Sequence, residues 1–148
     1  MQFEIRKAQL ADVPSIHGLV HELAVYEKAA DQVLTTQAMF QQDFSSGAFD
    51  AVVAINPETG QLVGMALYYT AYSTWKGKYL WLEDFVVQSD YRRLGLGKLL
   101  FDEVLRIARE SNAFMKFQVL DWNTPAMGFY DTYGVQYERE WITCRKWL

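Results

Sequence analysis

Several features that would assign a chain to a broad class of protein are missing from this sequence. It has one cysteine, Cys144, in 148 residues, so no internal disulfide can form, which fits a reducing compartment. We find no charged start followed by an apolar run and no stretch apolar enough to span a membrane. Repeats, low-complexity tracts and Pro/Gly/Ser-rich linkers are missing too. We therefore expect a cytoplasmic protein that folds as one domain, 1–148.

Positive charge is in short supply as well. The 14 Lys and Arg residues are outnumbered by 18 Asp and Glu, which gives a net charge of −4. Such a chain is not built to coat nucleic acid or an anionic membrane. Residues 1–74 carry 8 acids and 3 bases, and residues 75–148 carry the other 10 acids and 11 bases. Either the two halves face ligands of opposite sign, or the split is ordinary fluctuation.

Apolar and aromatic residues, by contrast, are plentiful. Hydrophobic residues make up 51% of the chain and aromatic residues 16%, with 5 Trp, 9 Tyr and 9 Phe. This composition is that of a folded globular protein and excludes intrinsic disorder. So many large rings in a small chain suggest that some of them line a cleft or an interface as well as the core.

The spacing of apolar residues predicts a mixed α/β fold of order β-α-α-β-β-β-α-β-α-β(-β). We therefore expect a central mixed sheet of six to seven strands with about four helices. The sheet is mixed because the strand–helix–strand sequence in the middle of the chain implies a parallel crossover. Asp12 is the expected cap of the first helix, which has Pro14 in its first turn. The expected helices are 12–24, 36–44, 96–110 and one that is opened by Thr124 and Pro125 and closed by Gly134. The expected strands are 3–5, a hairpin of 51–55 with 62–69, 79–87, 114–120 and one or two in 135–147.

A short glycine loop joins the expected central strand to the following helix. Glycines let backbone N–H groups turn inward, and the helix N-terminus adds further donors and partial positive charge. The loop therefore predicts a phosphate or pyrophosphate site, and the alternative is a simple tight turn into a helix. It fits neither a Walker A motif, since Leu99 follows the lysine, nor a dinucleotide fingerprint, since Leu100 stands where a third glycine belongs. The residues of this loop are Arg92, Arg93, Leu94, Gly95, Leu96, Gly97 and Lys98.

The pattern Arg92-x-x-Gly95-x-Gly97 after a strand resembles the acetyl-CoA pyrophosphate loop of the GNAT N-acetyltransferases. Further segments resemble the diamine acetyltransferases of that superfamily, namely the spermidine/spermine and thialysine N-acetyltransferases. The resemblance covers residues 3–141. These segments are Glu22-Leu23-Ala24-x-Tyr26-Glu27, Tyr72-Ser73-Thr74-Trp75-Lys76-Gly77, Leu82-Glu83-Asp84-Phe85-x-Val87, Leu120-Asp121-Trp122-Asn123 and Phe129-Tyr130.

The resemblance is strongest to the thialysine branch. Spermidine/spermine enzymes have an acid in the position of Ser73, and an acid there suits a polycation. Gly128 and the short C-terminus also depart from the family pattern. Family membership implies acetyl-CoA as cosubstrate, direct attack by a primary amine of a small molecule, and a homodimer. It implies no metal, and although His17 and His21 are four residues apart, no third ligand at zinc spacing follows them.

The resemblance also implies roles for individual residues. Glu83 would bind the amine and accept its proton, and Tyr130 would donate a proton to the departing thiolate. A buried structural carboxylate and a core tyrosine are the alternatives for these two residues. In this fold the strand splays after Glu83, which would free backbone groups of Phe85, Val86 and Val87 for the cofactor.

Acceptor capture and the pantetheine arm complete the expected site. Carboxylates attract an ammonium group, and an aromatic face holds it by cation–π contact. Trp75 could instead form a dimer contact, and Glu27 could be a solvated charge at a helix end. The expected amine-binding residues are Tyr26, Glu27, Trp75, Glu83 and Asp84, and those expected along the pantetheine arm are Asn123, Thr124, Pro125 and Ala126.

We therefore expect an acetyl-CoA-dependent N-acetyltransferase that acts on a thialysine-, diamine- or polyamine-like amine. One alternative is acetylation of a protein N-terminus or another small amine. An alternative of another class is a CoA-binding regulatory module without catalysis, against which the presence of Glu83 and Tyr130 argues.

Overall fold

The computed structural model describes residues 2–111 and 114–148, and the chain forms two compact units, Met1–Gln118 and Val119–Leu148. We describe each unit by itself. The elements of the first unit are β1 (Glu4–Lys7), α1 (Val13–Tyr26), α2 (Gln37–Ser45), β2 (Asp50–Ile55), β3 (Leu62–Ser73), β4 (Gly77–Val87), α3 (Leu96–Ser111) and β5 (Met115–Phe117). The second unit holds α4 (Thr124–Asp131).

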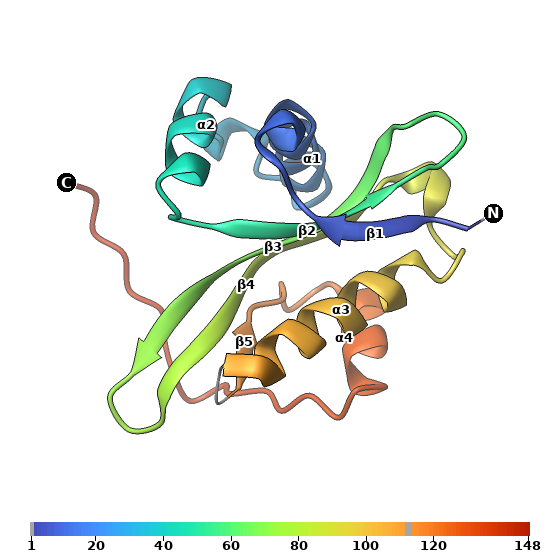
Figure 1. Ribbon diagram of the computed structural model, residues 1–148. Coiled ribbons are helices and arrows are strands. Elements are labelled where there is room, and N and C mark those ends of the chain that lie inside the picture. The colour runs from blue at the N-terminus through green and yellow to red at the C-terminus, as the bar shows by residue number, and fades with distance from the viewer. Residues whose placement is uncertain (1, 112–113) are drawn as a thin grey trace. The chain divides into compact units, whose positions relative to one another are not determined.

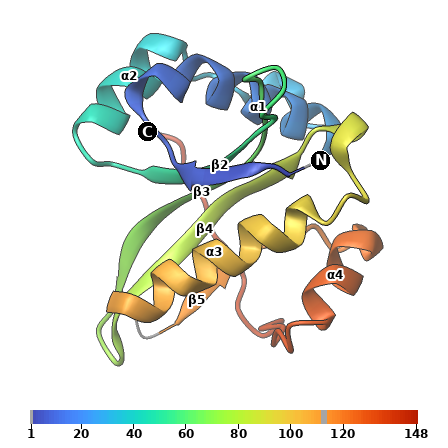
Figure 2. The same ribbon diagram turned by 45° about the vertical axis from the view of Figure 1, so that its right-hand side comes forward.

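One mixed sheet organises the first unit. Its strand order is β1-β2-β3-β4-β5, with antiparallel pairing up to β4 and parallel pairing of β4 with β5. Helices α1 and α2 cover one face of the sheet and α3 covers the other (Figures 1 and 2). The predicted hairpin and the predicted parallel crossover are both confirmed.

Each face of the sheet has its own apolar core. On the α1 face, Ile16 and Leu19 pack into a cluster with β-strand residues that include Leu67. On the other face α3 is held close to β3 by a glycine. A Cβ atom built on Gly64 would lie 3.1 Å from Leu100 Cδ1 and 3.2 Å from the Val86 carbonyl oxygen. A larger residue at this position would push the helix off the sheet.

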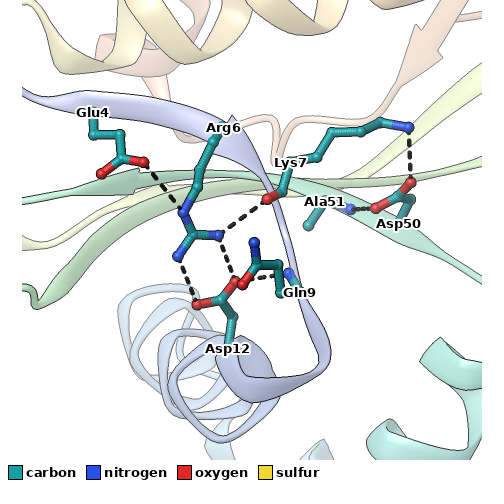
Figure 3. A network of polar contacts seen from close by, with 7 residues as sticks. All are labelled: Glu4, Arg6, Lys7, Gln9, Asp12, Asp50 and Ala51. Atoms are coloured by element: carbon teal, nitrogen blue, oxygen red, sulfur yellow. Dashed lines mark hydrogen bonds and ion pairs between the residues drawn. The ribbon is translucent and has the colours of Figure 1, made fainter.

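The junction of β1 with α1 is held by an ion pair (Figure 3). Arg6 donates from Nη1 to Asp12 Oδ2 at 2.7 Å and from Nη2 to Asp12 Oδ1 at 3.1 Å. The same carboxylate accepts from the Gln9 backbone N–H at 2.7 Å. Asp12 does stand at the N-cap position of α1, but its side chain caps no N–H of that helix. The predicted N-cap position is therefore confirmed, and the carboxylate is bound by Arg6 and Gln9 rather than by an N–H of the helix.

A long ribbon extends from the sheet (Figure 1). The pairing of β2 with β3 begins at Asp50 opposite Tyr68, whereas the pairing of β3 with β4 runs on to Ser73 opposite Gly77. The β3 and β4 strands therefore continue together beyond the reach of β2. Trp75 lies in the turn at the tip and is 88% exposed.

The second unit differs from the prediction in two ways. The cap of α4 is Asn123, whose side-chain oxygen accepts from the Ala126 N–H at 3.3 Å, rather than Thr124. Residues 135–148 hold neither helix nor strand. The sheet of the described residues has five strands, so the predicted six to seven strands are not confirmed. Alternating apolar residues need a partner to bury them, and here Trp141, Ile142 and Trp147 are exposed.

Candidate active site

A β-bulge in β4 forms the centre of the candidate site. Leu82 pairs with Tyr68 and Asp84 pairs with Leu67, so Glu83 is the extra residue between them. Directly opposed residues of two strands lie on the same face of a sheet, and neighbours along a strand alternate. Since Leu67 packs with α1, Asp84 lies on the α1 face, whereas Leu82 lies on the α3 face. Without the bulge, Leu82 and Asp84 would share a face.

Electrostatic repulsion links three carboxylates at and near the bulge, those of Asp84, Glu83 and Glu27. Burial raises the pKa of Asp84, and repulsion from Glu83 and Glu27 raises it further, to about 6. Glu27 follows the last turn of α1, and burial raises the pKa of its carboxyl too. The predicted acceptor residues Glu27, Glu83 and Asp84, which come from two distant parts of the sequence, therefore lie near enough to interact. A cation placed among them would relieve their repulsion.

Glu83 itself is exposed, so it is not a buried structural carboxylate. Its Oε2 accepts a hydrogen bond from the Trp81 indole Nε1–H at 2.6 Å. The indole holds one carboxylate oxygen in place, and the other oxygen keeps its acceptor capacity for a ligand. Trp81 was not predicted as a site residue. Its place two residues before Glu83 was the available signal, because residues i and i+2 share the face of a regular strand.

The pairing of β4 with β5 ends close to the bulge. Its last pair is Leu82 with Phe117, and β4 continues through Phe85, Val86 and Val87 along β3. The ladder between these two strands thus stops one residue before Glu83. The predicted parting of the strands after Glu83 agrees with this geometry.

The glycine loop contains two residues in the left-handed region. Arg93 has a φ of 64° and Gly95 a φ of 79°. A left-handed arginine costs about 1 kcal/mol, so this shape is held by its surroundings. The two residues lie between the extended Arg92 and the first turn of α3. Leu94, Leu96, Gly97 and Lys98 complete the segment.

The basic side chains of this loop differ in their contacts. Lys98 forms an ion pair with Asp102 at 2.6 Å. Arg92 donates from Nε to the Val87 carbonyl oxygen at 3.0 Å, and its guanidinium carbon lies 5.3 Å from the centre of the Tyr26 ring. This contact between the predicted donor loop and the predicted acceptor helix was not foreseen. Nothing in the local sequence signals it, because Tyr26 and Arg92 meet only through the tertiary fold.

The structure does not bring Trp75 to the carboxylates within one chain. Glu83 lies six steps along β4 from Gly77, which is at the tip of the ribbon. At 3.3 Å a residue this is about 20 Å. The Ser73 hydroxyl accepts from the Trp75 and Lys76 N–H groups and shapes the turn, which leaves the indole exposed.

The remaining predicted residues lie in the second unit. Asn123, Thr124, Pro125 and Ala126 form the cap and the first turn of α4. Tyr130 lies on the last turn of that helix, is 7% exposed, and packs edge to face with Phe129 at 5.6 Å.

Metal and membrane features can be judged for residues 2–111 and 114–148. Within this part of the chain, no group of three or more His, Cys, Asp or Glu side chains could hold a metal ion. His17 instead contacts the Thr35 carbonyl oxygen from Nε2 at 2.9 Å and packs edge to face with His21. No helix of the same residues combines the length and apolarity needed to cross a bilayer.

Comparisons with known proteins point to one family. The acetyltransferase (GNAT) family matches residues 16–135. A thialysine N-epsilon-acetyltransferase of Caenorhabditis elegans is 34% identical over 131 residues, 88% of this chain and 81% of that protein. One of Bos taurus is 36% identical over 141 residues, 89% of this chain and 83% of that protein. The crystal structure of an aminoglycoside acetyltransferase from an uncultured soil metagenomic sample shares the fold, with a TM-score of 0.81 at 17% identity over 99% of this chain and 96% of that one.

Proposed function

This chain belongs to the acetyltransferase (GNAT) family and is an acyltransferase, and we propose that it transfers acetyl from acetyl-CoA to a primary amine of a small molecule. The observation that carries the proposal is the group of three carboxylates around the bulge of β4. Two similar relatives are thialysine N-epsilon-acetyltransferases, and thialysine has such an amine on a short chain. We therefore propose a thialysine- or diamine-like acceptor.

The carboxylates have two tasks in this proposal. A lysine-like amine has a pKa of about 10.4, so at pH 7 it arrives as an ammonium ion. Glu27, Glu83 and Asp84 attract that charge. The amine must then lose a proton before it can attack, and Glu83 accepts it through a water molecule. The pKa of about 6 makes Asp84 a stronger base than an ordinary aspartate, yet leaves it mostly ionised at pH 7.

The glycine loop fits a pyrophosphate. The left-handed residues Arg93 and Gly95 bend the chain just before α3, whose N-terminus offers backbone N–H donors to an anion. When bound, acetyl-CoA supplies a thioester with an acyl group open to attack and a thiolate that can leave. We place Phe85, Val86 and Val87 beside the acyl end and residues 123–126 along the pantetheine arm.

Tyr130 is the proposed proton donor to the departing thiolate. The reference pKa of a phenol is near 10 and that of a thiol near 8.5, so on these values the transfer is slightly unfavourable. It takes place only once negative charge has built up on the sulfur as the carbon–sulfur bond breaks. Replacing a general acid typically costs about 10²–10⁴ in rate. We expect Tyr130→Phe to lower kcat on this scale and to leave CoA affinity nearly intact. An unchanged kcat would remove Tyr130 from this role.

The proposal is tested by release of free thiol from acetyl-CoA in the presence of single amines. The panel comprises thialysine, propane-1,3-diamine, spermidine and a peptide with a free N-terminus. Release with thialysine or a diamine supports the proposal, and release with the peptide alone would favour N-terminal acetylation. Tight CoA binding with no release for any amine would make the chain a CoA-binding module. A homodimer is proposed as well, and light scattering tests it.

A further inference from the structure

We propose that Arg92 is a positioning residue that couples the donor loop to the amine site, so that CoA and the amine each tighten binding of the other. The inference rests on the function proposed above and adds to it a mutual dependence of the two binding sites. It is carried by two contacts of one side chain, which reach from the loop to the end of α1.

The first contact ties Arg92 to the end of the central strand. Its Nε donates to the Val87 carbonyl oxygen at 3.0 Å, and Val87 is the last residue of β4. The same strand carries Glu83 and Asp84, and after Val87 the chain passes through a short turn into the loop. This bond fixes the Nε edge of the guanidinium with respect to the strand.

The second contact places the guanidinium on α1. Its carbon lies 5.3 Å from the centre of the Tyr26 ring, within the range of a cation–π interaction. Tyr26 is the last residue of the helix and its ring is 39% exposed, so burial alone does not fix it. The positive charge over the ring face therefore helps to hold Tyr26, and with it the end of α1, in place.

Tyr26 leads directly to the carboxylates. Glu27 follows it as the C-cap of α1, where its N–H donates to the Leu23 carbonyl oxygen at 2.9 Å. Lys28 then turns into the left-handed region with a φ of 61°, so the chain leaves the helix through a tightly defined turn. The Glu27 charge acts on Asp84. Because Glu27 follows Tyr26 directly, a displacement of the helix end at Tyr26 carries the Glu27 backbone with it.

A physical path thus joins the two sites. A pyrophosphate held by the amides of 93–98 fixes the loop backbone, and with it the start of the Arg92 side chain. The guanidinium then holds Tyr26 and Glu27 in the position that an ammonium ion needs. By linkage, an amine bound to the carboxylates favours the loop conformation to the same extent.

This role differs from that of a phosphate ligand. If the guanidinium turned to a phosphate oxygen, it would leave Tyr26, and CoA would weaken amine binding rather than strengthen it. A lysine in place of Arg92 keeps the positive charge, but it has no planar guanidinium and no N–H at the position of Nε. Arg92→Lys therefore separates positioning from simple charge.

The experiment measures thialysine affinity by calorimetry with and without saturating CoA, which cannot react. The ratio of the two Kd values is the coupling factor, and propane-1,3-diamine is the second probe. A cation–π contact at a partly exposed site corresponds to about a two- to fivefold effect. We expect Arg92→Lys and Tyr26→Leu each to lower the coupling factor by this amount, and the double variant to lower it no further. Tyr26→Phe keeps the ring and should keep the coupling.

Matched controls identify each way of failing. Arg93→Gln should weaken CoA binding and leave the coupling factor as it is in the wild type. Wild-type coupling in Tyr26→Leu, additive losses in the double variant, or weaker thialysine binding with CoA present would each overturn the inference and leave the proposed function standing. If the wild type binds no CoA, or neither amine, the proposed function falls and the inference with it.

Discussion

Asp12 and Asp84 carry the same carboxyl group in opposite electrostatic settings. Asp12 is held by both ends of the Arg6 guanidinium and by a backbone N–H, and these bonds keep its pKa below the usual range. Burial, together with repulsion from the Glu83 and Glu27 carboxylates, raises the pKa of Asp84 to about 6. The first arrangement lowers the free energy of the folded chain. The second raises it, and a bound cation would relieve it.

This contrast explains how one acidic unit can hold both structural and ligand-binding aspartates. Asp12 lies where β1 turns into α1, and its partner Arg6 is only six residues away in sequence. Asp84 lies at a bulge that breaks the regular alternation of a central strand. The Asp12 carboxylate stabilises the fold through nearby partners, whereas the Asp84 carboxylate destabilises it. Such a local loss of stability is typical of binding sites.

The largest effect expected from this contrast is on catalysis. Asp84→Asn removes one of the charges that attract the ammonium ion, and a hydrogen bond or ion contact to a charged group contributes about 1.5–3 kcal/mol. We expect kcat/KM for thialysine to fall by about 10- to 100-fold. Thiol-release kinetics measure this change. The same amide substitution at Asp12 is the matched control, and it should leave kcat/KM within about twofold of the wild type.

The second effect is on stability and has opposite signs at the two sites. Asp12→Asn loses a charged hydrogen-bonded pair, so the free energy of unfolding should fall by about 2 kcal/mol. Asp84→Asn removes a repelled carboxylate. A shift of its pKa from 3.8 to about 6 corresponds to about 3 kcal/mol, so the variant should be more stable at pH 7. Urea unfolding at neutral pH compares the two. A destabilised Asp84→Asn protein would show that the carboxylate is paired rather than repelled.

The pH dependence of stability should separate the two aspartates further. The folded chain binds the Asp84 proton more tightly than the unfolded chain does, so the contribution of Asp84 becomes less favourable as pH rises from about 4 to about 6. The Asp12 contribution is complete above about 4 and is lost as pH falls through its lowered folded pKa. Unfolding of the wild type and both variants from pH 3 to pH 7 tests this. Parallel curves for the wild type and Asp84→Asn between pH 4 and pH 7 would contradict it.

The smallest expected effect is at the buried hydroxyl group of Tyr68. Tyr68 lies opposite Asp50, and its buried hydroxyl finds no hydrogen-bond partner among residues 2–111 and 114–148. Burial, together with the charges of Asp50 and Glu103, raises the pKa of this phenol. Tyr68→Phe should therefore stabilise the protein by about 1 kcal/mol, which thermal unfolding would detect. A loss of stability would reveal a partner for the hydroxyl.

Local patterns were enough to predict most of the fold. The apolar spacing around Ile16 and Leu19 predicted α1, and the turn residues after Ile55 predicted the hairpin. The tail at 135–148 was wrongly expected to form strands, because alternation indicates a strand only where a partner strand exists. The cap at Thr124 was also wrong, because the neighbouring Asn123 takes the N-cap position, whereas Asp12 was correctly placed at the N-cap of α1.

The site was predictable in its residue types but not in its geometry. Glu27, Glu83 and Asp84 were expected to meet the amine, which stays a prediction. The structure shows that the charges of Glu83 and Glu27 both act on Asp84. The bulge that turns Asp84 to the α1 face depends on the register of β3 against β4, which no local pattern encodes. For the same reason the contact of Arg92 with Tyr26 could not be predicted from two residues far apart in the chain.

The central claim is that the carboxylates at the bulge bind and activate an amine for acetylation. The most direct test is the initial rate of thiol release from acetyl-CoA with thialysine, measured in parallel for the wild type, Asp84→Asn and Asp12→Asn at one pH. The claim predicts release by the wild type, a loss of tenfold or more in Asp84→Asn, and a rate close to the wild type in Asp12→Asn. Equal rates for the wild type and Asp84→Asn would contradict it.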